Sequence, residues 1–335
     1  MRSEREKEIT ERAVLEIRGL QISFKQYEKG FRQTNLDVIR DLDVTVRPGE
    51  IVAIVGSSGS GKSLLAHAVL GILPYNASVG GEILYNGVVL TEKMLKKLRG
   101  EEIVLVPQST AYLDPLMKTG PQIRKGKNDR KSREKLDRIF TEYELDLKVQ
   151  ELYPFELSGG MTRRIMNSTA LMGNPKLVIA DEPTPGLHIS AAKRAMGHFR
   201  ELADLGAGVL LITHDLELAI ETADRIAVFY AGTTVEETDA KNFRSCETLG
   251  HPYSRALWRA MPQHGFEPIP GTQPYVKSMP KGCPFGPRCP YFTEKCTEKP
   301  EWKTSGTGRV RCVLSGRTGA ETGSRCEIEW QQKER

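Results

Sequence analysis

Residues 51–66 read IVAIVGSSGSGKSLLA, and this stretch decides the fold. The apolar run IVAIV follows Pro48-Gly49 and is typical of a buried parallel strand. The apolar spacing of SLLAHAVLGIL predicts a helix directly after the loop. The loop itself matches the pattern GxxxxGK[ST] at every fixed position, through Gly56, Ser57, Ser58, Gly59, Ser60, Gly61, Lys62 and Ser63. Strand, loop and helix in this order predict an α/β fold.

The composition of this loop suits phosphate groups. Small residues let backbone N–H groups curl around the phosphates, and the N-terminus of the following helix adds partial positive charge. Lys62 would then reach the β- and γ-phosphates, while the Ser63 hydroxyl would ligate magnesium. A Gly/Ser-rich turn without a ligand is the alternative, and the strand and helix on either side weigh against it. The loop therefore predicts ATP and magnesium as cofactors.

A second apolar run, LVIADE at residues 177–182, ends in two acids. In a parallel sheet these acids would stand at the same edge as the phosphate loop. We expect Asp181 to hold magnesium and Glu182 to polarise the attacking water. Alone, two acids after a strand more often cap a helix. The phosphate loop earlier in the chain is what favours the catalytic interpretation.

Two further apolar runs end in polar side chains. VLLITHD places His214 after one strand, and IVLVPQ places Gln108 after another. A lone histidine is usually structural, but at this sheet edge a contact with the γ-phosphate is the better interpretation. The amide oxygen of Gln108 is a candidate magnesium ligand. We expect the ends of all four strands to converge.

The length, apolar runs and net charge of the chain are ordinary for a globular protein in water. With 335 residues, one large domain and a smaller appendage are expected. No apolar run is long enough to span a bilayer, and the charged N-terminus resembles no signal peptide, so we expect a cytosolic protein. The net charge is +5, and residues 124–138 hold eight basic and three acidic residues. A solvated surface is favoured there over contact with lipid or nucleic acid.

The stretch LSGG at residues 157–160 identifies the kind of ATPase. Phosphate loop, Gln108, LSGG, LVIADE and His214 follow one another in an order that resembles the ATP-binding subunit of ABC transporters, over residues 14 to about 235. The resemblance implies a RecA-like core, an antiparallel β subdomain and a helical subdomain at about residues 109–172. It also implies that two such subunits pair through their ATPase domains, which in this chain would span residues 14–240. Each ATP would then be held between the phosphate loop of one subunit and the LSGG signature of the other.

In that arrangement Ser158, Gly159 and Gly160 would bind the γ-phosphate held by the partner, as a helix N-terminus can. An aromatic residue after the first strand should stack on adenine, and Tyr27 is preferred over Phe24 and Phe31. Two features depart from the family. His188 stands where the family usually has aspartate, which puts the equivalence of the two ATP sites in doubt. The 48 residues between Gln108 and Leu157 are few for a helical subdomain.

The end of the chain resembles one branch of that family. GHPYSRALWRAMP, IPGTQP, the stretch GCPFGPRC and VRC, all within residues 250–314, are similar to the C-terminal extension of oligopeptide, dipeptide and nickel importers. Cys283, Cys289, Cys296 and Cys312 are spaced C-x5-C-x6-C-x15-C. Clustered thiols in a reducing cytosol favour metal over disulfides, and their spacing alone fits zinc or an iron–sulfur cluster. The resemblance implies a 4Fe-4S cluster; zinc and unligated core cysteines stay as alternatives.

Together these observations predict an α/β ABC ATPase at residues 14–240, a small cysteine-rich domain at 241–314 and flexible tails at 1–13 and 315–335. The expected function is energy coupling for import of peptides, nickel or related solutes, at the cytoplasmic face of the membrane. Expected partners are a second, similar ATPase subunit, two membrane permeases and, indirectly, an extracellular binding protein, with no nucleic acid. A soluble ABC ATPase acting on nucleic acid or ribosomes is the alternative, and a redox-sensing regulatory subunit is a third hypothesis.

Overall fold

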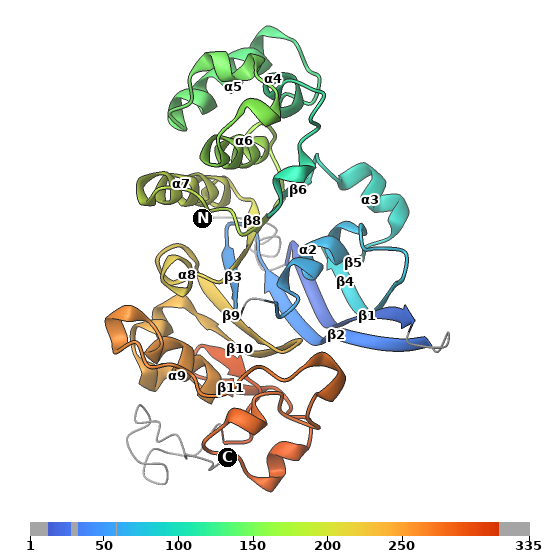
Figure 1. Ribbon diagram of the computed structural model, residues 1–335, viewed down its shortest axis with the longest axis vertical. Coiled ribbons are helices and arrows are strands. Elements are labelled where there is room, and N and C mark those ends of the chain that lie inside the picture. Colours follow the sequence, from blue (N-terminus) through green and yellow to red (C-terminus); the bar gives the residue numbers. More distant parts are fainter. Residues whose placement is uncertain (1–12, 28–32, 58, 315–335) are drawn as a thin grey trace, which may run out of the picture.

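A computed structural model describes residues 13–27, 33–57 and 59–314 of the chain (Figure 1). The predicted tails, apart from Ala13, lie outside these residues. One mixed sheet organises the fold. Its strands are β1 (Leu15–Tyr27), β2 (Gln33–Val46), β3 (Ile51–Val55), β4 (Ala77–Tyr85), β5 (Val88–Val89), β6 (Ile103–Val106), β7 (Leu177–Asp181), β8 (Gly208–Thr213), β9 (Arg225–Tyr230), β10 (Thr233–Asp239), β11 (Lys303–Ser305) and β12 (Gly308–Val310).

The order of strands along the sheet is β5-β4-β1-β2-β10-β9-β3-β8-β7-β6, with β12 paired to β10 and β11 to β12. The pairs among β9, β3, β8, β7 and β6 are all parallel, which confirms the predicted parallel core. Strands β1, β2, β4 and β5 pair antiparallel and form the expected β subdomain. The strand order therefore places four strands side by side, namely β3, β8, β7 and β6. These are the strands that lead to the predicted site residues.

Helices cover the parallel strands and continue above them. The α-helices are α2 (Lys62–Leu70), α3 (Glu92–Leu98), α4 (Thr119–Ile123), α5 (Arg130–Glu142), α6 (Gly159–Leu171), α7 (Ile189–Asp204), α8 (Leu216–Thr222) and α9 (Pro252–Arg259). The 3-10 helices are η2 (Thr110–Tyr112), η3 (Leu147–Glu151), η4 (Pro154–Glu156), η5 (Ala240–Arg244), η6 (Cys246–Thr248), η7 (Pro262–His264), η8 (Val276–Ser278), η9 (Gly286–Arg288) and η10 (Glu294–Thr297). Figure 1 shows α4, α5 and α6 together at the top, beyond the sheet, where the helical subdomain was expected.

Both faces of the parallel sheet are buried, which explains its continuous apolar runs. Ile51, Ala53 and Val55 of β3 point into one core cluster, while Val52 and Ile54 point into the other. The first cluster also contains side chains of α5, α6 and α7, and the second contains side chains of α2, β1 and β2. A strand buried on both faces does not alternate polar and apolar residues. Its sequence is therefore a continuous apolar run, which is why these strands could be predicted.

The C-terminal extension, residues 241–314, packs into the ATPase rather than around a core of its own. Tyr253 and Phe285 belong to the first core cluster of the sheet. Strand β12 pairs antiparallel with β10, with Glu236 opposite Val310 and Glu237 opposite Arg309. The extension has few apolar residues, so it buries them by borrowing the core and the sheet edge of the ATPase.

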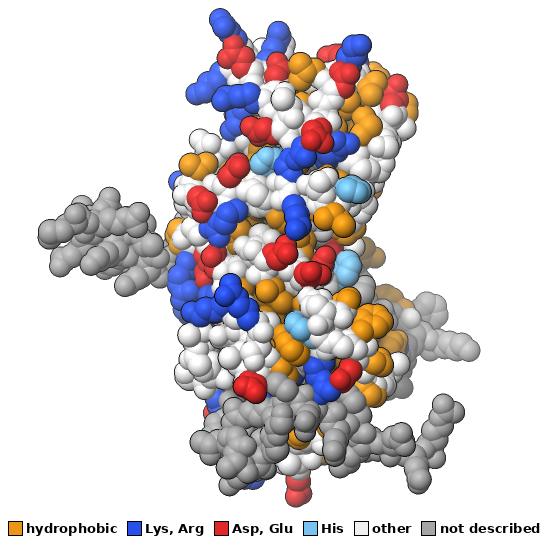
Figure 2. All heavy atoms as spheres, turned by 90° about the vertical axis from the view of Figure 1, so that its left-hand side faces the viewer, with side chains coloured by type: hydrophobic (Ala, Val, Ile, Leu, Met, Phe, Trp, Pro, Cys, Tyr) orange, Lys and Arg blue, Asp and Glu red, His pale blue; other side chains and the backbone are white. Residues whose placement is uncertain are grey.

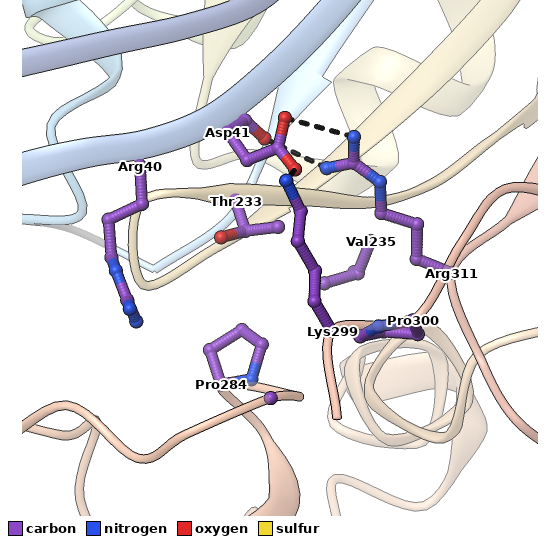
Figure 3. Close-up of a pocket in the computed structure, with 9 residues that line it drawn as sticks. Arg40, Asp41, Thr233, Val235, Pro284, Lys299, Pro300 and Arg311 are labelled. Carbon is purple, nitrogen blue, oxygen red and sulfur yellow. Dashed lines mark hydrogen bonds and ion pairs between the residues drawn. The ribbon is translucent and has the colours of Figure 1, made fainter. Parts of the chain in front are cut away.

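A buried charge cluster ties the end of the extension to β2. Figure 3 shows Lys299 and Arg311 reaching Asp41 from the extension. The Arg311 guanidinium pairs with the Asp41 carboxylate at 3.0 Å and also with Asp43, and the Lys299 ammonium lies 2.6 Å from the Asp41 carboxylate. Arg311, Asp41 and Asp43 are almost inaccessible to solvent. Because these three charges are buried, removing Arg311 would leave Asp41 with only the exposed Lys299 and would take from Asp43 the arginine that neutralises it.

We therefore expect Arg311→Ala to lower the free energy of unfolding by about 3–5 kcal/mol, the usual cost of breaking a buried ion pair. Urea titration followed by circular dichroism would measure the loss. Lys303→Ala, at an exposed position of β11, is the matched control and should change stability little. An Arg311→Ala protein that unfolds at the wild-type urea concentration would show that the cluster does not hold the extension in place.

The basic segment at residues 124–138 lies in the helical subdomain. Figure 2 shows Lys and Arg side chains gathered at the upper end of the molecule, with acidic side chains among them. Asp129 caps α5, and Arg130 pairs with Glu134 one turn along the exposed helix. These local pairs on an exposed helix fit the solvated surface that the sequence analysis favours. Within the described residues, no helix has the length and apolar character that crossing a membrane requires.

Candidate nucleotide-binding site

The predicted site residues meet at one edge of the parallel sheet. The phosphate loop follows β3, His214 follows β8, Asp181 ends β7, and Gln108 lies just beyond β6. These four strands are neighbours in the order β3-β8-β7-β6. Since parallel strands end on the same side, the side chains that follow them are brought together.

Two glycines of the loop have structural reasons to be glycine. Gly61 adopts φ 93°, a left-handed conformation that other residues rarely take, directly before α2. A Cβ on Gly56 would lie 2.1 Å from the Phe229 carbonyl oxygen of β9, which is too close for any side chain. The loop therefore passes tightly over the sheet before it turns into the helix. Ser58 lies outside the described residues.

Lys62 begins α2 and turns its side chain back over the loop. Its side chain is buried, and Nζ donates to the carbonyl oxygens of Gly56 at 2.8 Å and Ser57 at 2.9 Å. Burial lowers the pKa of Lys62, and the nearby carboxylates of Glu182 and Asp181 oppose that shift. The ammonium group thus stands in the cradle where phosphate oxygens would be bound.

The three predicted magnesium ligands lie together. The Ser63 hydroxyl donates to Asp181 Oδ1 at 3.1 Å and lies 3.5 Å from the amide oxygen of Gln108. Burial raises the pKa of Asp181, while the hydrogen bond from Ser63 acts in the opposite direction. A hydroxyl, a carboxylate and an amide oxygen are the hard ligands that Mg²⁺ prefers, and the divalent charge would offset the burial of Asp181. The donor set fits the cation.

Glu182 and His214 form a pair beside these ligands. His214 Nδ1 lies 2.8 Å from Glu182 Oε1, while Glu182 Oε2 is buried and has no hydrogen-bond partner among the described residues. Glu182 also has φ 48°, a left-handed conformation that is costly for a residue with a side chain. Glu182 therefore has one carboxylate oxygen bound to His214 and a second, buried oxygen with no partner among the described residues, which is available to accept a proton.

The signature stretch forms the start of α6. Ser158 is the N-cap, its Oγ accepts from the Met161 backbone N–H, and Gly159 is exposed. A Cβ on Gly159 would meet nothing within 4 Å. This open helix N-terminus has room for an anion that approaches from outside the chain, as the resemblance implies.

Arg163, one turn further along α6, was not singled out in the sequence. Its buried guanidinium donates to the Pro107 carbonyl at 2.9 Å and to the Gln108 carbonyl at 2.7 Å. Burial lowers the pKa of this residue. Arg163 therefore joins the signature helix to the segment that carries Gln108. No sequence signal marks Arg163, because its helix GGMTRRIMNSTAL also holds Arg164 and several other polar residues, and the burial of Arg163 follows only from packing.

The residue that departs from the family, His188, stands at the N-cap position of α7. Its side chain makes no capping hydrogen bond, and Nδ1 instead lies 3.2 Å from the Ser190 hydroxyl. Aspartate is among the preferred N-cap residues because its carboxylate accepts from the free N–H groups of the first turn. Histidine at this place leaves those N–H groups uncapped by its side chain.

Of the two described candidates for stacking on adenine, Tyr27 is the more accessible. Tyr27 ends β1, its side chain is 70% exposed, and its hydroxyl accepts from Gln33. Phe24 is half-buried and packs against the second core cluster, so its ring is already in use. Phe31 lies outside the described residues. Tyr27 stays the preferred prediction.

The four clustered cysteines sit between the extension and the sheet. Cys296 and Cys312 are buried, and Cys283 and Cys289 are half-buried. Burial, with a smaller contribution from the other thiols of the cluster, raises the pKa of Cys283 to about 11 and that of Cys289 to about 12. No three His, Cys, Asp or Glu side chains of the described residues are grouped as ligands of a metal ion would be.

Family models match two parts of the chain. The model described as "ABC transporter" matches residues 39–185, and the one described as "Oligopeptide/dipeptide transporter, C-terminal region" matches residues 235–296. The first match spans the phosphate loop, the signature and Glu182. The second spans α9 and three of the four clustered cysteines.

Curated relatives match almost the whole chain. The oligopeptide transport ATP-binding protein OppD of Salmonella typhimurium is 35% identical, over 90% of this chain and 93% of the relative. The protein AppD of Bacillus subtilis, also named for oligopeptide transport, is 33% identical over 92% and 98%. The dipeptide transport ATP-binding protein DppD of Escherichia coli is 34% identical over 89% and 95%.

Solved structures share the fold of the ATPase part. The dimeric structure of the ATP-binding cassette MJ0796 bound to ADP and Pi has a TM-score of 0.59 and is 24% identical, over 68% of this chain and 98% of its own. The cassette cbiO1 of Clostridium perfringens has a TM-score of 0.54 at 24% identity, over 69% of this chain and 90% of its own. The predicted ABC ATPase fold is confirmed.

Proposed function

The chain belongs to the ABC transporter family, in the branch of oligopeptide and dipeptide transport ATP-binding proteins, and from that premise we propose that it drives the import of peptides. It is an ATPase whose hydrolysis is coupled to transport. The pairing of Glu182 with His214 next to Ser63, Asp181 and Lys62 carries the ATPase part of the proposal, and the similarity to oligopeptide and dipeptide transport proteins carries the choice of peptides. Nickel, the other solute expected from the sequence, stays a prediction.

In this proposal the phosphate loop binds ATP in the following way. Lys62 exchanges the carbonyl oxygens of Gly56 and Ser57 for β- and γ-phosphate oxygens, which are stronger acceptors because they are charged. Ser63, Asp181 and Gln108 hold magnesium, which neutralises charge on the phosphates. Tyr27 stacks on adenine. These residues bind and orient the nucleotide.

Glu182 and His214 then act on the water. Glu182 Oε2, which is buried without a partner among the described residues, accepts a proton from the attacking water. His214 holds the other carboxylate oxygen in place through Nδ1, and in this proposal it also contacts the γ-phosphate. The rigid end of β7 fixes the carboxylate, so little reorganisation is needed during the reaction.

The second half of the site comes from a partner ATPase subunit. Ser158, Gly159 and Gly160 form the exposed helix N-terminus that would bind the γ-phosphate held by that partner. We propose a partner that is similar but not identical, because His188 makes this chain's contribution at the interface unlike the usual aspartate. The two ATP sites between the subunits would then differ in how each responds to events at the other.

We propose that the membrane partners are two permease subunits. The chain would bind to them as a peripheral subunit at the cytoplasmic face of the membrane. The relatives named above are transport proteins. Arg163 supports a route for the signal, since it links the signature helix to the backbone at Gln108. Closure of the ATP site would move the helical subdomain and, through it, the permeases. An extracellular binding protein would select the solute.

For the four cysteines we propose a 4Fe-4S cluster, bound by Cys283, Cys289, Cys296 and Cys312. The chemistry of the donors fits, because all four are thiols, the ligands that iron–sulfur clusters take, and Cys283 and Cys289 are near enough to other thiols of the set for these to raise their pKa. A single zinc ion binds thiolates at about 2.3 Å and so draws them close together. A cluster is larger and would hold its four thiolates farther apart, so iron and sulfide analysis distinguishes the two.

Anaerobic purification followed by iron, sulfide and zinc analysis tests this proposal. About four irons and four sulfides per chain, lost in Cys289→Ser, are expected. Cys246→Ser is the matched control, because Cys246 lies outside the spaced set, and it should keep the iron. Stoichiometric zinc, or no metal under anaerobic conditions, would contradict the cluster and leave the ATPase assignment unchanged.

A further inference from the structure

The extension touches the phosphate loop directly, at Ser57. The Ser57 hydroxyl donates to the side-chain oxygen of Gln273 over 2.5 Å. The two residues are 216 positions apart in the sequence. Gln273 belongs to the stretch IPGTQP, which the ATPase motifs do not include. The loop that would hold ATP is thus in contact with a part of the chain outside the ATPase domain.

Tyr253, from the HPY stretch that opens α9, reaches the same serine. Its side chain is 1% exposed, and its ring packs against Tyr230 at 4.4 Å and Phe285 at 5.3 Å between ring centroids. Burial raises the pKa of Tyr253 to about 12, and hydrogen bonding with the side chain and backbone of Ser57 opposes the rise. The phenol is therefore un-ionised and fixed against the loop.

The stretch that carries Gln273 is itself held by the cysteine region. Arg288, the neighbour of Cys289, donates to the Ile269 carbonyl at 2.9 Å and the Pro270 carbonyl at 2.7 Å. Its guanidinium also bonds the Tyr230 hydroxyl at 3.1 Å. The position of Gln273 is thus set by a packed part of the extension rather than by a loose loop.

These contacts matter most when ATP binds. Lys62 holds the carbonyl of Ser57, and that bond is given up when Lys62 turns to the phosphates. Gly56, just before, has no room to shift toward β9, because Phe229 lies against it. The bond from the Ser57 hydroxyl to Gln273 uses no backbone N–H group of the loop, so it can remain and keep the loop in shape as Lys62 leaves.

We propose that Gln273 and Tyr253 are positioning residues for the phosphate loop, so that the C-terminal extension prepares the site for ATP. This inference rests on the ATPase function above. A preformed loop gives up less conformational freedom on binding, and the gain appears as affinity. Glu182 and His214 stand on other strands, so the rate of hydrolysis at saturating ATP depends little on these contacts.

The test is the affinity of the purified full chain for a trinitrophenyl derivative of ATP, measured by fluorescence titration with magnesium. Gln273→Ala and Tyr253→Phe should each raise Kd about 2- to 10-fold, the range for one neutral hydrogen bond. The kcat of ATP hydrolysis should change less than about twofold. Tyr275→Phe is the control: Tyr275 lies two positions from Gln273, is 64% exposed, and should bind ATP like wild type.

A double-mutant cycle separates positioning from general loss of structure. In a Ser57→Ala background the partner of Gln273 is gone, so Gln273→Ala should have no further effect on Kd. Additive effects, or a Gln273→Ala chain with wild-type Kd, would overturn the inference. A wild-type chain that fails to bind the nucleotide would instead contradict the ATPase function itself, which distinguishes the two failures.

Discussion

Glu182→Gln should reduce steady-state ATP hydrolysis by about 10²- to 10⁴-fold, the range for loss of a general base. Glutamine keeps the shape of the side chain but cannot accept a proton from water. His214 can still contact the amide, and Lys62, Ser63 and Asp181 are unchanged, so the Kd for ATP should stay within about twofold. Release of phosphate from Mg-ATP and fluorescence titration of nucleotide would measure the two quantities separately.

Glu217→Gln is the matched control for this change. Glu217 lies in the first turn of α8, is exposed, and follows the same sheet edge without facing the site. It should hydrolyse ATP at the wild-type rate. Hydrolysis by Glu182→Gln within about threefold of wild type would contradict the role of Glu182 and favour the regulatory hypothesis, in which hydrolysis is vestigial.

Gly159→Asp should nearly abolish hydrolysis at the ATP site that this chain completes in its partner. The new carboxylate would stand at the helix N-terminus where we propose that the partner's γ-phosphate binds. Two like charges about 4 Å apart at a protein surface repel by about 4 kcal/mol, which corresponds to about 10³-fold in the closing of that site. Hydrolysis by the assembled transporter, measured with and without the substitution, gives the effect.

An aspartate side chain introduced at position 159 has room, so loss of folding would not explain the result. A Cβ there meets nothing within 4 Å, and the same is true of Gly197 on the exposed surface of α7. Gly197→Asp is therefore the matched control. The isolated Gly159→Asp chain should bind ATP with wild-type affinity, because its own phosphate loop is intact. Unchanged hydrolysis in the assembled transporter would argue against the shared site.

The parallel core and its site could be predicted because each part has a local signature. The strands β3, β7 and β8 are buried on both faces, so their apolar runs are continuous. Each run ends where a polar side chain follows, and parallel strands place those ends at one edge. Strand order then brings Ser63 to Asp181 and Glu182 to His214 without any further information.

Contacts between distant parts of the chain could not be predicted in this way. The cysteine pattern predicts a small separate domain after residue 240, whereas the extension shares the sheet edge and core of the ATPase. Nothing local to Gln273 or Tyr253 marks them as neighbours of Ser57, because the contact depends on how α9 and the cysteine region dock. The link from Arg163 to Gln108 depends in the same way on how α6 packs.

Peptide uptake by cells that lack only this chain tests the central claim most directly. Uptake of a labelled oligopeptide should fall to background in these cells, return with the wild-type chain and fail to return with Glu182→Gln. Such a result would tie peptide import to ATP hydrolysis at this site. Uptake that persists without the chain, or that Glu182→Gln restores in full, would contradict the account.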